Sequence, residues 1–319
     1  MFCVSIWAWI QKLFAPVVEY HLERRSVQLI STIAEGGFAF IDLVEDRRTK
    51  ERFALKRLLC QSQEQLQTAR HERDIMARLN HPNIMKMIDM GEVKDDNGQT
   101  MVLLLLPLCP RGSLLGEIQW RRQSKVWFPE HEMLTLFQAI CQAVGYMHAC
   151  QPSLAHRDLK PGNVLLDDKV GALLTDFGST CGADVHVVSR QEAMRIQEQA
   201  SIHSTISYRP PELFHVKVDS KLDGRTDVWG LGCLLYAMAY GQSPLDEVLD
   251  SGGSIALAVV DLKIRHSPPN RYSKPTRTLI DSMLSKNLKD RPTVPQILKS
   301  VDKILSQTSP PQVSLQIES

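Results

Sequence analysis

The sequence has no excess of charge of either sign and no cysteine pairs at metal-binding spacing. Lys and Arg total 37, Asp and Glu total 36, and the formal net charge of the 319 residues is +1. Proteins held on nucleic acid by counterion release usually carry a basic excess, so nucleic acid is not expected as a partner. The seven Cys include no C-x-x-C pair, which argues against a disulfide framework and against a zinc site. The composition therefore predicts a reduced, cytoplasmic globular protein.

The two ends of the chain differ from its middle. Residues 1–24 are mostly apolar and include two Trp, but the first basic residue is Lys12, so the early positive charge of a secretory signal is missing. A spanning helix needs about 20 consecutive apolar residues, and polar residues interrupt this stretch. Two interpretations stay open: an interfacial helix that contacts a membrane, with Cys3 as an acyl acceptor, or a segment packed on the following domain. Residues 306–319 are expected to form a flexible tail.

Hydrophobic patterning divides residues 25–305 into a strand-rich part and a helix-rich part. Short apolar runs between turn residues predict strands, and apolar residues three and four positions apart predict helices. The expected strands are 29–44, 53–59 and 101–106, and the expected helices are 64–79, 131–149, 226–240, 273–284 and 294–305. This order predicts an α+β fold with a small β-rich N-lobe (25–106), a larger α-helical C-lobe (110–305) and a cleft between them.

Two polar segments of the helix-rich part contain the residue types that phosphoryl transfer requires. The first, His156-Arg157-Asp158-Leu159-Lys160-Pro161-Gly162-Asn163, places a carboxylate, a cation and an amide in one tight loop, and Asp176-Phe177-Gly178 follows it. Taken alone, an Asp is most often a cap or a solvated charge, and an Asn most often belongs to a turn. In this order and spacing, the segments resemble H-R-D-x-K-x-x-N and D-F-G of the protein kinases.

The resemblance implies the bilobal protein-kinase fold, with ATP in the cleft and proteins as substrates. Asp158 would accept the proton of the substrate hydroxyl, and Lys160 would add a positive charge near the transferred phosphoryl. Asn163 and Asp176 would hold Mg²⁺ through hard oxygen ligands. The Lys at this place in the loop is similar to that of the serine/threonine kinases, in which a Thr, here Thr205, bonds both the base and this Lys.

The N-terminal part contains a candidate glycine-rich loop. Ala34-Glu35-Gly36-Gly37-Phe38-Ala39 lies between two apolar, strand-like segments, where kinases carry G-x-G-x-x-G over the nucleotide. Ala34 and Ala39 replace the first and third Gly, so the motif alone is more typical of a plain Gly-Gly turn. Its position upstream of a kinase-like strand favours the nucleotide-binding interpretation.

The strand F-A-L-K, which ends at Lys56, resembles the V-A-I-K strand of kinases. Lys56 is therefore expected at the α- and β-phosphates of ATP, with Glu72 of the next helix as its ion-pair partner; a surface Lys on an edge strand is the alternative. By the same resemblance, Leu106 is the gatekeeper of the nucleotide site. Pro107 lacks an N–H but can offer its carbonyl to adenine, and Cys109 would supply the N–H donor.

Residues beyond D-F-G extend the resemblance. Thr205 to Glu212 is similar to the end of a kinase activation segment, with Pro210 in place of the Ala of A-P-E. In the family, Glu212 would pair with Arg291, and Asp227 would brace the catalytic loop. Such an ion pair is costly to break from one side.

Finer features resemble the Numb-associated kinase family and, within it, the myristoylated and palmitoylated branch. A-E-G-G-F-A in the glycine loop and T-I-S-Y-R in the activation segment carry this similarity. The branch is linked to the Golgi and to secretory trafficking, and it inserts a helix in the activation segment, for which residues 190–200 have the composition. Myristoylation requires Gly after Met1, and Phe2 stands there, so membrane attachment would depend on Cys3 and the apolar stretch. A pseudokinase scaffold is the alternative function, which the complete catalytic set disfavours.

Overall fold

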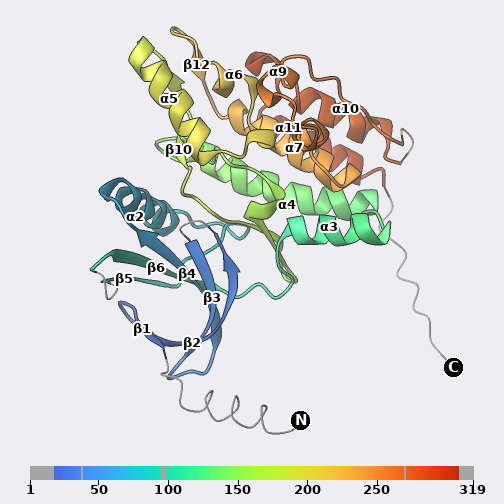
Figure 1. Ribbon diagram of the computed structural model, residues 1–319. Coiled ribbons are helices and arrows are strands. Elements are labelled where there is room, and N and C mark those ends of the chain that lie inside the picture. The colour runs from blue at the N-terminus through green and yellow to red at the C-terminus, as the bar shows by residue number, and fades with distance from the viewer. Residues whose placement is uncertain (1–17, 37–38, 95–97, 269–270, 309–319) are drawn as a thin grey trace, which may run out of the picture. The chain divides into compact units, whose positions relative to one another are not determined.

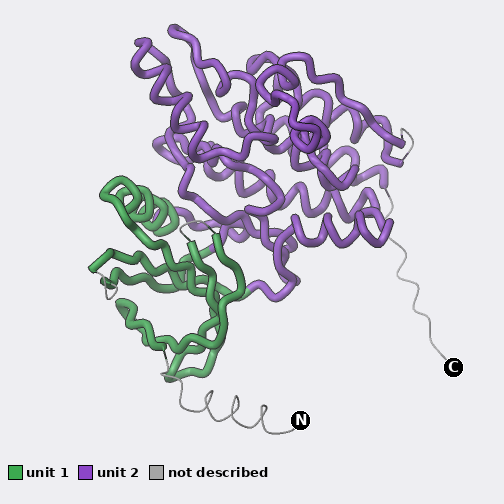
Figure 2. The backbone as a smooth tube through the Cα atoms, in the orientation of Figure 1, with its two compact units in different colours: residues 1–77, 86–108 green, residues 78–85, 109–319 purple. Residues whose placement is uncertain are grey.

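The chain folds into two compact units. The computed structural model describes residues 18–36, 39–94, 98–268 and 271–308. One unit consists of residues 1–77 and 86–108, and the other of residues 78–85 and 109–319 (Figure 2). The predicted anchor around Cys3, the loop residues Gly37 and Phe38, and the tail from residue 309 lie outside the described residues.

A six-stranded antiparallel sheet forms most of the first unit, with strand order β1-β2-β3-β4-β6-β5 (Figure 1). The strands are β1 (Glu19–His21), β2 (Ser26–Glu35), β3 (Ala39–Asp46), β4 (Arg52–Cys60), β5 (Asp89–Lys94) and β6 (Thr100–Pro107). Inward-facing side chains form its core, with Val44, Leu55 and Leu105 fully buried.

The sheet begins earlier than the sequence predicts. β1 lies within the segment 1–24, and its Tyr20 is paired with Val27 of β2. Tyr20 and Leu22 also pack on the core of the unit, which explains why an apolar pattern continues this far. The strand expected over 29–44 is two strands, β2 and β3, because the chain turns at Gly36.

One helix, α2 (Gln63–Arg78), follows β4. Its buried residues recur at helical spacing and are Leu66, Ala69, Glu72, Ile75 and Met76. The buried carboxylate of Glu72 is paired with Lys56 of β4. On the exposed side, Arg70 and Arg73 bind Glu92 of β5 at 2.7 and 3.0 Å. These ion pairs connect α2 to two strands of the sheet.

The second unit is mainly helical. Its α-helices are α3 (Leu114–Ser124), α4 (Glu130–Ala149), α5 (Arg190–His203), α6 (Pro211–Phe214), α7 (Arg225–Tyr240), α8 (Asp246–Asp250), α9 (Ile255–Ala258), α10 (Lys274–Met283) and α11 (Val294–Leu305). Helix α7 is buried along nearly its whole length and contacts α4 and α10. A helix that is apolar on all sides is expected at the centre of such a bundle.

Short strands and 3₁₀ turns carry the polar segments of the second unit. They are β7 (Leu154–Ala155), η1 (Pro161–Asn163), β8 (Val164–Asp167), β9 (Gly171–Leu174), β10 (Cys181–Gly182), β11 (Val185–His186), η2 (Ile206–Tyr208), β12 (Lys221–Leu222) and η3 (Leu288–Asp290). β8 and β9 form a hairpin, and β10 pairs with β7. The segment 156–163 therefore runs between β7 and β8, and residues 175–178 follow β9.

The predicted α+β class is confirmed: a β-sheet unit is followed by a helical unit. The ends of the long predicted helices fall within one residue of α2, α4, α7, α10 and α11. Helix α3 is not among the predicted helices, and α5 extends to His203, three residues beyond the predicted end of the inserted helix.

Candidate active site

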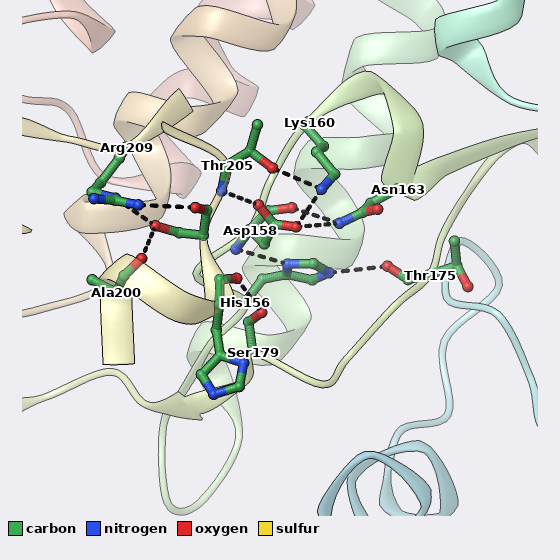
Figure 3. A network of polar contacts seen from close by, with 11 residues as sticks. His156, Asp158, Lys160, Asn163, Thr175, Ser179, Ala200, Thr205 and Arg209 are labelled. Carbon is green, nitrogen blue, oxygen red and sulfur yellow. Dashed lines mark hydrogen bonds and ion pairs between the residues drawn. The ribbon is translucent and has the colours of Figure 1, made fainter. Parts of the chain in front are cut away.

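The carboxylate of Asp158 lies at the centre of a hydrogen-bonded cluster in the second unit (Figure 3). Its Oδ1 accepts the backbone N–H of Thr205 at 2.8 Å. Its Oδ2 accepts from the Asn163 side-chain amide at 2.9 Å and lies 2.7 Å from Nζ of Lys160. Lys160 also donates to Oγ1 of Thr205 at 2.7 Å. The structure thus brings together four residues that the sequence places up to 47 positions apart.

Asp227 of α7 fixes the backbone just before Asp158 through hydrogen bonds to two N–H groups. Its Oδ2 accepts the N–H of His156 at 2.8 Å, and its Oδ1 accepts the N–H of Arg157 at 2.9 Å. His148 also contacts Oδ2, through Nε2 at 2.9 Å. Burial alone would raise the pKa of Asp227, but the bonds from His148 and Arg157 outweigh it and hold the pKa below its usual value. Asp227 is therefore held as a buried carboxylate.

His156 has a role that the sequence argument did not assign. Its ring is fully buried, and Nδ1 accepts the N–H of Asp158 at 3.3 Å. Nε2 then carries the proton and donates to the carbonyl of Thr175 at 3.1 Å (Figure 3). The ring also contacts the buried ring of Phe177 edge-on, with centroids 5.5 Å apart. This His joins the catalytic loop to the segment that contains Asp176. Its place in the H-R-D motif is the feature of the sequence from which this role could have been predicted.

The candidate metal ligands, Asn163 and Asp176, lie on two segments of the chain that are joined by a hydrogen bond. The N–H of Thr175 donates to the carbonyl of Asn163 at 3.0 Å, which sets Asp176 beside the catalytic loop. Asp176 has a left-handed backbone with φ 66°, so the chain turns sharply there. The Asn163 amide nitrogen donates to the carbonyl and carboxylate of Asp158, so its Oδ1 is the atom that could bind a metal ion.

An Asn oxygen and an Asp carboxylate fit a hard divalent ion that takes most of its other ligands from phosphates and water. Within the described residues, no cluster of three or more His, Cys, Asp or Glu side chains could hold a metal ion. Two oxygen donors of this kind are typical of a cation that is bound together with the phosphates of a nucleotide.

The first unit contains the other candidate nucleotide residues. Nζ of Lys56 lies 2.7 Å from Oε1 of Glu72, and both side chains are largely buried. Ala34 and Glu35 end β2, and the N–H of Gly36 donates to the carbonyl of Ala39 at 2.7 Å, where β3 begins. This bond joins the paired strands β2 and β3 on either side of the predicted glycine loop, whose nucleotide-binding role stays a prediction.

The predicted hinge residues lie at the end of β6. Leu106 is 7% exposed and is paired with Ala54 of β4, while Pro107 is paired with Phe53. Cys109 is the first residue of the chain in the second unit after β6, and burial raises the pKa of its thiol. The raised pKa keeps the thiol protonated at neutral pH.

Comparison with known proteins identifies the family. Residues 27–301 match the protein kinase domain family. The chain belongs to the protein kinase family. Serine/threonine-protein kinase 16 of Homo sapiens is 38% identical over 297 residues, which cover 93% of this chain and 95% of that protein, and its Mus musculus counterpart is 36% identical over the same shares. Serine/threonine-protein kinase ppk13 of Schizosaccharomyces pombe is 29% identical over 91% of this chain and 93% of that protein.

The chain is therefore a serine/threonine protein kinase, and membership of the family implies the use of ATP and a divalent metal. An ion pair between Glu212 of α6 and Arg291 anchors the end of its activation segment. The pair is bidentate, at 2.8 and 2.7 Å, and the Arg291 side chain is fully buried. Arg291 also donates to the carbonyls of Ser285 and Arg225. One guanidinium thus ties α6, the start of α7 and the segment before α11 together.

Proposed function

We propose that this kinase is catalytically active and transfers the γ-phosphoryl of Mg²⁺-bound ATP to serine or threonine hydroxyls of proteins, with Asp158 as the base. One observation carries the proposal: Asp158 is 7% exposed, and its carboxylate is held in place by Asn163, Lys160 and the Thr205 amide. A base needs a fixed position within reach of the hydroxyl, because proton transfer depends on geometry before it depends on pKa.

The remaining residues divide the task of positioning charge. Lys160 neutralises Asp158 on one side and is anchored by Thr205, so its cation stays near the base. Asn163 and Asp176 would hold Mg²⁺, which when bound neutralises phosphate charge. Lys56 would contact the ATP phosphates, with Glu72 holding its ammonium in the sheet unit. Most of the rate enhancement of phosphoryl transfer comes from such positioning and charge stabilisation.

A pseudokinase scaffold is the competing proposal, and a single variant separates the two. Asp158→Ala should lower kcat by about 10²- to 10⁴-fold, the usual contribution of a general base, while ATP binding and the melting temperature change little. Asp168→Asn is the matched control, because this carboxylate follows β8 and its side chain is 83% exposed. A folded Asp158→Ala protein that keeps more than about half of the wild-type kcat contradicts the role of Asp158 as base.

We also propose that the chain belongs to the Numb-associated family. Support comes from the glycine loop, with Ala34 and Ala39 at two Gly positions, and from a helix, α5, inserted in the activation segment. The similarity to serine/threonine-protein kinase 16 over nearly the whole chain agrees with this placement.

A further proposal is peripheral attachment to the cytosolic face of Golgi or other secretory-pathway membranes through Cys3 and the apolar N-terminal stretch. No helix among the described residues is long and apolar enough to cross a membrane. A single acyl chain binds membranes only marginally, so the Trp-containing apolar stretch would supply the second signal that stable attachment needs.

Cell fractionation tests the attachment. The full chain should appear in the membrane fraction, Cys3→Ser should reduce that share, and a chain shortened to begin at Val18 should be soluble. Val18 is the correct starting point because Glu19–His21 form β1, and a shorter chain would expose the edge of β2. Equal partitioning of the full and shortened chains would show that the N-terminal segment does not bind membranes.

A further inference from the structure

The C-terminal end of α5 is held by a guanidinium from the segment that follows it. Nε of Arg209 donates to Oγ of Ser204 at 2.8 Å, and Nη2 donates to the carbonyls of Ser204 and Ser201 at 3.1 and 3.4 Å. Oγ of Ser204 in turn donates to the carbonyl of Ala200 at 2.6 Å. The last carbonyls of a helix lack intrahelical hydrogen-bond donors and carry partial negative charge. A guanidinium at this place supplies both the donors and the opposite charge.

A second contact holds the same end of the helix from the other side. Ser179, just beyond Phe177-Gly178, donates its hydroxyl to the carbonyl of His203 at 2.6 Å. The next two residues of the chain are Ser204 and Thr205, and Thr205 donates its N–H to Asp158. The position of the Thr205 amide is therefore fixed by the end of α5, which is fixed by Ser179 and Arg209.

Arg209 is an unusual residue to bury for packing alone. It is 8% exposed, its guanidinium lies over the ring of Phe214 at 5.0 Å, and the acceptors of its side-chain hydrogen bonds within the described residues are all on Ser201 and Ser204. Burial lowers the pKa of Arg209, and the charge of Asp158 opposes that shift, so the guanidinium lies within electrostatic reach of the base. A buried cation with backbone and hydroxyl acceptors imposes a geometry, because any movement of α5 leaves its donors unpaired.

We propose that Arg209 is a positioning residue of this kinase: it clamps the end of α5 so that the Thr205 amide stays on Oδ1 of Asp158. This inference rests on the proposed role of Asp158 as the base. It assigns to α5 the function of ordering the catalytic carboxylate through hydrogen bonds within the chain. A ligand or partner that displaces α5 would then change kcat without touching the catalytic loop.

The test compares Arg209→Met with Arg209→Lys and with Arg195→Met, which replaces an exposed Arg on α5. Arg209→Met should lower kcat by about 10- to 100-fold, the range expected for the loss of a hydrogen bond to a charged group, and should leave KM for ATP within about twofold. Arg209→Lys should recover part of the rate, because an ammonium can still reach one carbonyl. Arg195→Met should behave as wild type.

Amide hydrogen exchange supplies a readout that does not depend on turnover. In Arg209→Met, the Thr205 amide should exchange faster than in wild type, while the amides of His156 and Arg157 keep their protection. Ser204→Ala removes the Nε acceptor without removing the cation, and it should produce a smaller loss in the same direction. It carries the test if Arg209→Met fails to fold.

Two results would overturn the inference: unchanged kcat in Arg209→Met, or unchanged Thr205 exchange in both Arg209→Met and Ser204→Ala. An active Arg209→Met together with an inactive Asp158→Ala would refute the clamp alone. An active Asp158→Ala would refute the proposed base itself.

Discussion

Asp227 is a sensitive point at which to test the arrangement, because one buried carboxylate holds the backbone on which the catalytic loop begins. Its two oxygens accept three hydrogen bonds, from the N–H groups of His156 and Arg157 and from Nε2 of His148, all between 2.8 and 2.9 Å. The Asp227→Asn substitution keeps the size of the side chain and removes the charge. It therefore perturbs the hydrogen bonds with little change in packing.

The cost can be worked out from the geometry. The amide oxygen of Asn can take the place of Oδ2 and keep its two donors, but the NH₂ group then faces the N–H of Arg157. The N–H of Arg157 then loses its hydrogen bond to a charged acceptor and faces a second donor in a buried site, which costs about 1.5–3 kcal/mol. The two remaining bonds lose their charge assistance, so we expect a total of about 3–5 kcal/mol in the free energy of unfolding.

Urea unfolding of wild type, Asp227→Asn and the exposed control Asp168→Asn measures this cost. The difference in unfolding free energy between wild type and Asp227→Asn should become smaller at low pH. The pKa of Asp227 is lowered in the folded protein, so its contribution is complete above the unfolded value of about 4 and is lost as pH falls through the folded value. The gap between wild type and Asp227→Asn should narrow on acidification. An Asp227→Asn protein within about 1 kcal/mol of wild type at pH 7, with full kcat, would refute the reasoning.

Three further predictions concern the nucleotide, the activation segment and its ion pair. Lys56→Met and Asp176→Asn should each abolish most turnover and reduce the thermal shift caused by Mg·ATP. Lys56→Met removes a cation from the phosphates, and Asp176→Asn removes a hard ligand from the metal. If both variants phosphorylate like wild type, the nucleotide site lies elsewhere. Protein made in bacteria and treated with phosphatase should remain active, because α5 is ordered by its own packing, with Ala193 and Ala200 buried; a strict requirement for an upstream kinase would contradict this. Glu212→Gln should destabilise the protein by about 3 kcal/mol or more in urea unfolding, because it leaves the fully buried Arg291 without its charge partner, and a loss below about 1 kcal/mol would contradict that account.

The sequence predicts well the features that depend on local pattern. Helix α11 has the predicted ends because Pro295 stands in its first turn and its apolar residues keep a strict helical spacing. The catalytic set could likewise be predicted as a group, since Asp158, Lys160 and Asn163 lie within one short motif. The resemblance to the kinase motifs predicts which chemistry to expect of them, and their individual roles stay predictions.

What the sequence could not supply is contact between distant segments. The three residues of β1 are too few to show alternation in the sequence, and only pairing with β2 makes them a strand. Thr205 was expected beside Asp158, but the atom that meets the carboxylate is its backbone N–H, a detail with no side-chain signature. The Arg209 clamp depends on where α5 ends, and helix ends are poorly determined by local pattern.

The two supports of Asp158 differ in strength, and this difference predicts an order of opening. α7, which carries Asp227, is buried along nearly its whole length, whereas α5 leaves Met194 and Ile202 about two-thirds exposed, at 65% and 63%. Segments with few buried apolar contacts open at lower free energy than the core. Native-state hydrogen exchange should therefore release the Thr205 amide before the amides of His156 and Arg157, which Asp227 holds. Simultaneous exchange of all three would show that the activation segment and the catalytic loop open as one cooperative unit, and α5 could not then act as a separate control element.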